Sequence, residues 1–255
     1  MSGTTQRRAC DFGRLWKRYD GFLRDLIDRG GLKRVCDIGG GRNPRLDAGY
    51  VASRGLDYTV LDISPAELAL TPAWATKVCG DVAGDPPPAG LGPFDLCFSR
   101  MLAEHVKDGR RLHANVWSML RPGGLAVHFF PTLYCLPFLV NRWVPEAVSD
   151  RLLEVFSPRD RTKQGKFPAY YSWTRGPTRR QVRRLEGLGY EVPLYVGGFG
   201  HAYYRSLPGI RGLARAWAGY CARRELYAFT TFGVVVLRRP MGRGEEGQAM
   251  EWPEL

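Results

Sequence analysis

The feature that most constrains the fold of this chain is the stretch "RVCDIGGGRNPRL" at residues 34–46. A short apolar run ends there in three glycines, Gly39 to Gly41, which allow a sharp turn and a close approach of the backbone to a ligand. Asn43-Pro44 has the form of a helix N-cap followed by proline at the first helical position. The stretch therefore predicts a strand, a glycine loop and a helix.

Strands and helices are predicted to alternate along the rest of the chain. Apolar residues recurring every three or four positions predict a helix over 12–29, Ser64 and Glu67 form the capping box of another, and further helices are predicted over 101–120 and after Thr178. The predicted strands are "RVCDI", "DYTVLDI", "ATKVCGD", "FDLCFS", "LAVHFF", "YEVPLYVG" and "AFTTFGVVVLRR". This alternation is typical of an α/β fold with a parallel sheet covered on both faces.

The length of 255 residues favours a single domain with insertions. We expect the domain to cover 1–240, with irregular insertions over 132–177 and 199–226 and a disordered Gly/Glu-rich tail over 241–255. The N-terminus carries no apolar run, and no run approaches the ~20 residues that a spanning helix needs. We therefore expect a cytoplasmic protein.

Six cysteines are scattered along the chain, without a C-x-x-C pair or the Cys/His spacing of a zinc site. Cys36, Cys79 and Cys97 each fall within a predicted strand, which indicates small buried hydrophobic residues. We expect neither a disulfide framework nor a metal.

The formal net charge of +12 comes mainly from arginine. It is compatible with an anionic partner, and equally with a basic surface that is merely solvated. No RRM, KH or zinc-knuckle pattern is present, which argues against an RNA partner. No DNA partner is expected.

The glycine loop differs from the loop that binds dinucleotides. That fingerprint is G-x-G-x-x-G, and Pro44 stands where its third glycine would be. A short-chain dehydrogenase would also need a Y-x-x-x-K pair, which is absent from the chain. An acidic residue, Asp37, precedes the loop, where it would repel a pyrophosphate.

The spacing D-x-G-x-G over Asp37 to Gly41 resembles motif I of the class I S-adenosylmethionine (SAM)-dependent methyltransferases. Asp62 ends the second strand, where a carboxylate can accept both ribose hydroxyls. Asp81, in "CGDV", stands where this family places an acid against the adenine amino group. "SRMLAEHVKD" and "LRPGG" also look like the metal-independent branch called type 11.

This resemblance covers residues 33 to about 131 and implies a Rossmann-like sheet of order 3-2-1-4-5-7-6 with an antiparallel last strand. It also implies SAM as the cofactor, a covering helix over 12–30 and substrate-lid insertions after the fifth and sixth strands. "KFPAYYSW", "GPTRRQ" and "FGHAYYRSLP" resemble bacterial methyltransferases of secondary-metabolite or cell-surface saccharide clusters. The expected cofactor-binding residues are Tyr19, Asp37, Gly39, Gly41, Asp62, Ile63, Asp81, Val82, Ser99 and Arg100.

Missing residues exclude several methylation chemistries. "DPPP" precedes the fourth strand instead of following it, which excludes an amine-methylating N/D-P-P-Y/F site, and no Pro-Cys supplies a nucleophile for pyrimidine C5. Ser99-Arg100 and Pro131-Thr132 occupy the positions where Mg-dependent enzymes carry acidic and amide ligands. A metal-free mechanism is favoured.

Glu104 and His105 are the first candidates for the catalytic role, because the loop after the fourth strand faces the methyl donor in this fold. His201, after the sixth strand, is the second candidate. His128 reads as a core histidine and His113 as a helix residue without chemistry. The expected substrate wall is Tyr134, Arg142, Trp143, Tyr170, Tyr171, Trp173, Arg175, Tyr203 and Tyr204.

The sequence thus predicts a methyltransferase that acts on an oxygen, or else a nitrogen, of a small-molecule acceptor of natural-product or sugar type. The acceptor could be anionic. An RNA methyltransferase and a SAM-binding scaffold or cyclase remain alternatives. A weak membrane-surface contact is suggested by "LYCLPFLV" and its basic flanks, and a homodimer stays open.

Overall fold

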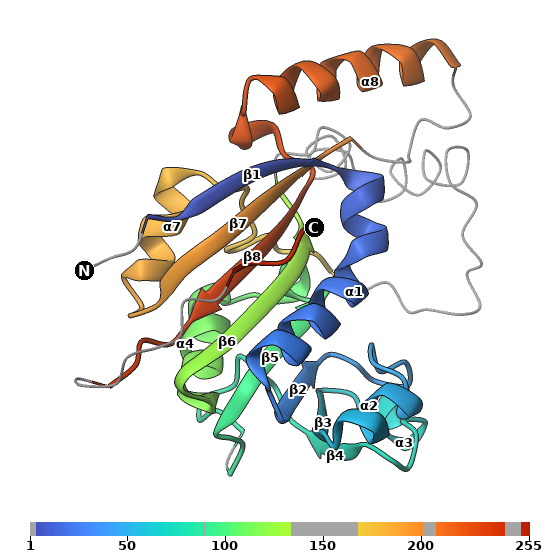
Figure 1. Cartoon of the computed structure of the whole chain (residues 1–255), viewed down its shortest axis with the longest axis vertical. Coiled ribbons are helices and arrows are strands. Elements are labelled where there is room, and N and C mark those ends of the chain that lie inside the picture. Colours follow the sequence, from blue (N-terminus) through green and yellow to red (C-terminus); the bar gives the residue numbers. More distant parts are fainter. Residues whose placement is uncertain (1–3, 89, 134–167, 201–207, 243–250) are drawn as a thin grey trace.

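The computed structural model describes residues 4–88, 90–133, 168–200, 208–242 and 251–255. Within them, eight strands form one sheet of order β1-β7-β8-β6-β5-β2-β3-β4 (Figure 1). The strands are β1 Gln6–Asp11, β2 Arg34–Ile38, β3 Asp57–Asp62, β4 Thr76–Cys79, β5 Phe94–Arg100, β6 Leu120–Pro131, β7 Glu191–Phe199 and β8 Phe232–Arg238. The helices are α1 Phe12–Gly30, α2 Ala48–Arg54, α3 Pro65–Ala69, α4 Gly109–Met119, α7 Arg179–Glu186 and α8 Pro208–Arg223, with 3-10 turns η1 Ala103–His105 and η2 Tyr227–Phe229.

The order β4-β3-β2-β5-β6-β8-β7 is the predicted order 3-2-1-4-5-7-6, and β8 is antiparallel to both of its neighbours as predicted. The strand β1 was not predicted. It extends the sheet by pairing in parallel with β7, from Gln6 opposite Leu194 to Asp11 opposite Phe199. Its sequence, QRRACD, lacks the apolar character of a central strand because β1 lies at the edge of the sheet.

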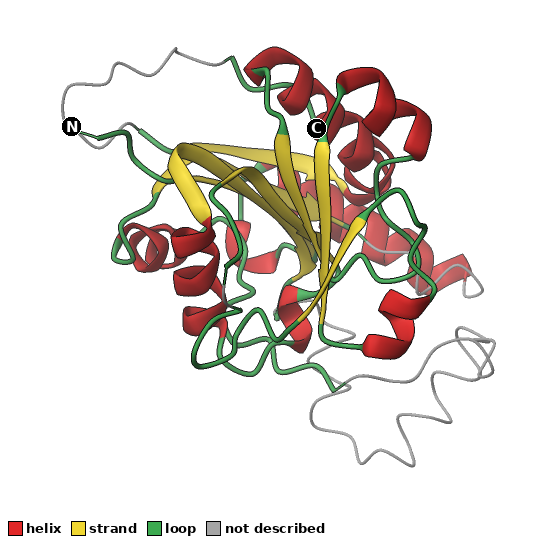
Figure 2. Cartoon of the chain, turned by 90° about the horizontal axis from the view of Figure 1, so that it is seen from below, coloured by secondary structure: helices red, strands yellow, loops and turns green. Residues whose placement is uncertain are grey.

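Helices cover both faces of the sheet (Figure 2). The helix α1 packs Leu15, Phe22 and Leu26 into one core cluster with the inward residues of β2, β5 and β6. Helices α4 and α7 pack against the opposite face, where Val116 and Leu185 belong to a second cluster. This arrangement leaves the loops at the carboxyl ends of the parallel strands free to form a site.

Local hydrogen bonds explain where the helices begin. Asp11 caps α1, and Ser64 and Thr178 cap α3 and α7 as predicted. Asn43 is not the cap of a helix, which corrects the prediction: its N–H bonds to Gly40 O at 3.0 Å in a turn, and α2 begins only after Asp47. The predicted helix over 101–120 is divided in two, η1 and α4, and Asp108 caps the second.

The last five residues contradict the expected tail. Trp252 packs against the first core cluster and Leu255 is buried in it. Glu254 pairs with Arg14 on α1 at 2.9 Å, and Arg29 donates to Glu251 O. A Gly/Glu-rich composition predicted disorder, whereas polar contacts with α1 and apolar contacts with the core cluster hold residues 251–255 in place. Residues 243–250 lie outside the described part.

The cysteines behave as predicted at two of three positions. Cys36 and Cys97 are buried at the centre of the sheet. Cys79 is exposed, because β4 is the opposite edge strand and has no neighbour beyond it. Among the described residues, none of the helices combines the length and the apolar character that crossing a membrane would require.

Candidate functional site

The glycine loop follows β2 and is tied to its neighbours by the backbone. Gly39 has φ 76° and Gly41 has φ 44°, a left-handed conformation that favours glycine. The N–H of Gly39 donates to Leu61 O at 2.7 Å, and the hydroxyl of Thr71 donates to Gly41 O at 2.7 Å. The loop is therefore a preformed turn at the carboxyl ends of β2 and β3.

Asp37 supports the loop from beneath. It is buried and accepts hydrogen bonds from the Arg45 N–H at 2.9 Å and the Tyr58 hydroxyl at 2.7 Å. A Cβ on Gly40 would lie 2.7 Å from this carboxylate, so only glycine fits there. Burial raises the pKa of Asp37 to about 6, against the opposing effect of these two donors. Its observed contacts order the loop.

Asp62 ends β3 and lies beside the glycine loop. Its Oδ1 accepts the Ser64 N–H at 2.9 Å, while a Cβ on Gly41 would lie 3.1 Å from its Oδ2. The carboxylate thus lies alongside the loop, and Oδ2 has no hydrogen bond within the described residues. Next to it, Ile63 is exposed.

Asp81 and Val82 follow β4. Asp81 is exposed and its Oδ1 accepts the Ala83 N–H at 2.8 Å, while Val82 is buried. Asn115, on α4, donates to Val82 O and Gly84 O, both at 2.9 Å. Asn115 was not predicted to belong to the site; it holds this turn in place, and no local sequence signal marks that role.

Three of the predicted cofactor-binding residues are engaged elsewhere. Tyr19 is fully buried and its hydroxyl donates to Ser99 O at 2.8 Å, which places its side chain in the core between α1 and the sheet. Ser99 is buried too, and its hydroxyl lies 2.8 Å from His128 Nδ1. Arg100 pairs with Asp20 at 3.3 Å and stacks over Trp16. The position of a residue along a strand predicts closeness to the site, but not the direction of its side chain.

Glu104 and His105 form the turn η1 directly after β5. Leu102, just before this turn, packs against the glycine loop. A Cβ atom added to Gly39 would lie only 2.2 Å from Leu102 Cδ1. Glu104 Oε1 is 3.6 Å from His105 Nε2, and His105 Nδ1 is 3.0 Å from Pro168 O. The predicted pair therefore exists, next to the loop.

Burial gives Glu104 unusual properties. It is 2% exposed, and Oε2 has no hydrogen-bond partner within the described residues. Burial raises its pKa to about 8. Its backbone carbonyl accepts from the N–H groups of Tyr170 and Tyr171 at 2.7 and 3.1 Å, which fastens that segment onto the turn.

The described candidates of the substrate wall lie in the segment after Pro168. Tyr170 is exposed, whereas Trp173 packs against Gly109 of α4 and is partly buried. Arg175 donates to Tyr171 O at 2.7 Å and its own carbonyl accepts from Tyr195. The structure brings Tyr170 and Tyr171 close to Glu104 and turns Trp173 toward the core. The remaining candidates, Tyr134, Arg142, Trp143, His201, Tyr203 and Tyr204, lie outside the described residues.

His128 and His113 face each other between the sheet and α4, with ring centroids 5.1 Å apart. Both are buried, and burial lowers both pKa values, that of His128 to about 4. The prediction of a core histidine at 128 is confirmed, although its Nε2 has no partner in the described part.

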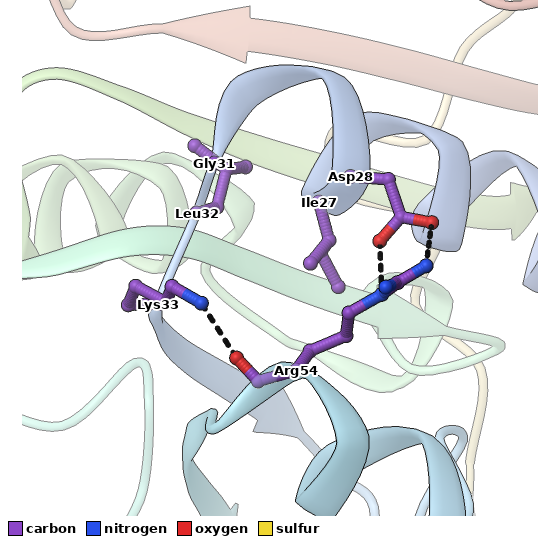
Figure 3. Close-up of a pocket in the computed structure, with 6 residues that line it drawn as sticks. All are labelled: Ile27, Asp28, Gly31, Leu32, Lys33 and Arg54. Atoms are coloured by element: carbon purple, nitrogen blue, oxygen red, sulfur yellow. Dashed lines mark hydrogen bonds and ion pairs between the residues drawn. The ribbon is translucent and has the colours of Figure 1, made fainter.

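A surface pocket lies at the opposite, amino edge of the sheet, between the ends of α1 and α2 (Figure 3). Its charged groups bind each other: Lys33 Nζ donates to Arg54 O at 2.6 Å, and Arg54 pairs with Asp28 at 2.8 Å. It is remote from the glycine loop, and the candidate site is therefore at the carboxyl edge.

Comparisons with known proteins agree with this site. The family model described as a methyltransferase domain matches residues 36–128, which include the glycine loop, Asp62, Asp81 and Glu104. Two curated relatives described as uncharacterized methyltransferases, from Mycobacterium sp. (strain KMS) and Mycobacterium sp. (strain JLS), are 36% and 37% identical over 111 and 109 residues. Each match covers 42% of this chain and 42% of the relative, so the similarity spans less than half of either.

Two solved structures share the fold. A putative sarcosine dimethylglycine methyltransferase from Galdieria sulphuraria has a TM-score of 0.52 at 14% identity, covering 88% of this chain and 86% of the other. The phosphoethanolamine N-methyltransferase 2 of Haemonchus contortus, in complex with SAM, has a TM-score of 0.51 at 16% identity, covering 90% and 56%. At such identities the likeness concerns the fold alone.

The residues present fit SAM. The left-handed glycine loop leaves no room for side chains on its Asp37 side, and the Asp62 carboxylate beside it suits ribose hydroxyls, which donate hydrogen bonds. Because SAM has no phosphate groups, its binding places no phosphate charge near the Asp37 carboxylate. Residues 36–128 thus match a methyltransferase-domain family, and the motif spacing and strand order are those of the class I SAM-dependent methyltransferase fold, whose cofactor SAM suits this site.

Proposed function

We propose that this chain transfers the methyl group of SAM to an oxygen, or else a nitrogen, of a small-molecule acceptor. The observation that carries the proposal is the contact of Leu102 with Gly39, because it sets the Glu104–His105 turn against the loop that holds the cofactor. An acceptor beside that turn would be close to the methyl group.

SAM supplies a reactive methyl group, so the main task of the protein is to align the acceptor in line with it. The ionised carboxylate of Glu104 takes the single proton of the acceptor hydroxyl, and His105, whose Nε2 lies 3.6 Å from Glu104 Oε1, positions that carboxylate. The buried carboxyl of Glu104 suits this role because its pKa is raised to about 8, close to the working pH of a base. Tyr170 and Tyr171, fastened to the Glu104 carbonyl, line the acceptor side.

The transfer is proposed to be metal-independent, on the ground that β5 and β6 end in Ser99-Arg100 and Pro131-Thr132 instead of acidic ligands. The proposal that the acceptor is a natural product or a sugar-type compound is based on the resemblance of residues 166–173 and 199–208 to methyltransferases of secondary-metabolite or cell-surface saccharide clusters. A basic acceptor is disfavoured by the net charge of +12.

A screen with radiolabelled SAM tests the proposal. The protein is incubated with panels of hydroxylated sugars, phenols, amines and total RNA, and labelled product is counted. We expect label in an oxygen acceptor, its loss in Glu104→Gln, and its retention in the presence of EDTA. Labelling of RNA alone, or of no acceptor despite tight binding of S-adenosylhomocysteine (SAH), would contradict the proposal.

A further inference from the structure

The helix α8 is attached to the sheet by one narrow face. Ala218, Cys221 and Ala222 face inward and pack with Phe199 at the end of β7 and Tyr227 of η2. Since β7 is parallel to β6, β5 and β2, its carboxyl end lies at the same edge of the sheet as the glycine loop. Figure 1 shows α8 along one side of the molecule, beyond the end of β7.

A stripe of large apolar side chains runs along another face of α8. It consists of Leu213, Trp217 and Tyr220, at spacings of four and three residues, and is continued by Phe229 of η2. Such spacing places the three helical residues on one face. Leu213 is 75% exposed and Trp217 52% exposed. The ring centroid of Trp217 lies 5.8 Å from that of Tyr220 and 5.6 Å from that of Phe229, so these three rings form one cluster.

The charges around this stripe are mainly positive. Arg223 and Arg224 are exposed at the C-terminal end of the stripe, Arg211 and Arg215 are exposed on the rest of the helix, and Glu225 is the one acidic residue between 208 and 229. On α1, by contrast, the exposed arginine Arg18 has an acidic neighbour, Asp25, at 3.8 Å. The α8 stripe therefore lies in a field that is positive on balance.

We propose that the α8 stripe and its arginines dock on an anionic lipid surface. Trp, Tyr and Leu side chains are those that an interfacial helix inserts at the boundary between headgroups and acyl chains, while Arg binds the headgroup phosphates. Together the two features select this partner: RNA would use the arginines and leave Leu213 in water, and a neutral apolar partner would have no use for the arginines. Docking on this face would bring the carboxyl edge of the sheet toward the lipid surface.

Sedimentation with vesicles tests the inference. The full chain is mixed with vesicles of phosphatidylcholine alone or with one third phosphatidylglycerol, and the bound fraction is measured against lipid concentration. We expect binding to the anionic vesicles only, weakened at least tenfold in the double variant Leu213→Ser/Trp217→Ser. Leu70→Ser, which removes an exposed apolar side chain far from α8 in sequence, serves as the matched control and should bind as the wild type does.

A second pair of substitutions separates lipid from nucleic acid. Arg223→Gln/Arg224→Gln should weaken binding and reduce its dependence on salt. SAH binding and the melting temperature are recorded for every variant, since all of these side chains are exposed and neither quantity should change. Equal binding of Leu213→Ser/Trp217→Ser and wild type, or binding of RNA that depends on the arginines alone while vesicles stay unbound, would overturn the inference. Vesicle binding and RNA binding are both measured without methyl transfer.

Discussion

The two ends of the carboxyl edge differ in how their side chains are used. At the cofactor end, between β2 and β4, Asp62 and Asp81 use backbone N–H groups of their own loops as partners and leave oxygens toward solvent or the glycine loop. At the end that is proposed to bind the acceptor, called the acceptor end, Glu104 is buried beneath the segment that carries Tyr170. The first end is built from short spaced motifs, and the second from packing between distant segments.

This difference has a chemical reason. SAM presents the same groups to every enzyme that uses it, so a short loop and a few carboxylates suffice to bind it. The acceptor differs between enzymes, and its binding surface comes from insertions, as is general for functional loops on a rigid scaffold. Substitutions at the two ends should therefore separate binding of the cofactor from turnover.

The largest effect is expected for Glu104→Gln at the acceptor end. Removal of a general base lowers kcat by about 10²–10⁴-fold, and because Gln has nearly the same shape, the affinity for SAH should not change. The kcat of the wild type should rise with pH up to about pH 8 as the carboxyl ionises, and this rise should be absent in the variant. Kinetics with the acceptor found by screening, alongside calorimetry with SAH, measure both. An SAH affinity that falls together with kcat would abolish the distinction between the two ends.

Asp62→Ala should affect the cofactor end. Loss of two hydrogen bonds to a carboxylate is worth on the order of 3 kcal/mol, or about 100-fold in Kd for SAH. The control is Asp57→Ala at the amino end of the same strand, where the side chain pairs with Arg34 at 3.3 Å, and it should leave the Kd unchanged. Equal losses in both variants would point to a general disturbance of β3.

Asn115→Ala tests how far the cofactor end depends on support from α4. The variant leaves Val82 O and Gly84 O without their donor, which should lower the free energy of unfolding by about 1–3 kcal/mol. The affinity for SAH should fall several-fold. Ser118→Ala, which removes only a hydrogen bond within the same helix, is the control. Denaturation with urea and calorimetry give the two values; an unchanged affinity for SAH would show that the turn after β4 holds its shape without Asn115.

The smallest effect concerns pH. Because the folded protein holds the proton of Glu104 up to about pH 8 while the unfolded chain loses it near pH 4.5, stability falls as pH rises through this range. His113 and His128 have the opposite effect on stability, because burial keeps them neutral in the folded protein while the unfolded chain can protonate them. This effect is confined to pH values below the pKa of an ordinary histidine. Between pH 7 and 8, therefore, Glu104 dominates, with a loss on the order of 1 kcal/mol. Urea denaturation of Glu104→Gln should lack this slope, and a wild type without the slope would indicate that Glu104 is ionised when folded.

The sequence predicted the parts of this fold that depend on local patterns. Seven of the strands, together with the caps Ser64 and Thr178, follow from apolar runs and capping side chains. It missed β1, whose partner β7 lies more than 180 residues further along the chain. It also missed the packing of Trp252 against the first core cluster, because such contacts arise only in the folded chain.

The same limit applies to the site. Asp37, Gly39 and Asp62 were expected at one edge of the sheet from spacing alone, and they lie there because a strand end brings them to that edge whatever the packing. The buried side chains of Tyr19 and Ser99 could not be expected from spacing, because their direction depends on α1 packing against the sheet. Asn115 reaches the site from a helix that is distant in sequence, and no motif announces it.

A glycine loop suited to SAM should not bind a dinucleotide. Calorimetric titration of the wild type with SAH and, separately, with NADH measures this difference. We expect SAH to bind with a Kd on the order of micromolar, or about −8 kcal/mol, and NADH to give no heat of binding. Binding of NADH without binding of SAH would contradict this expectation.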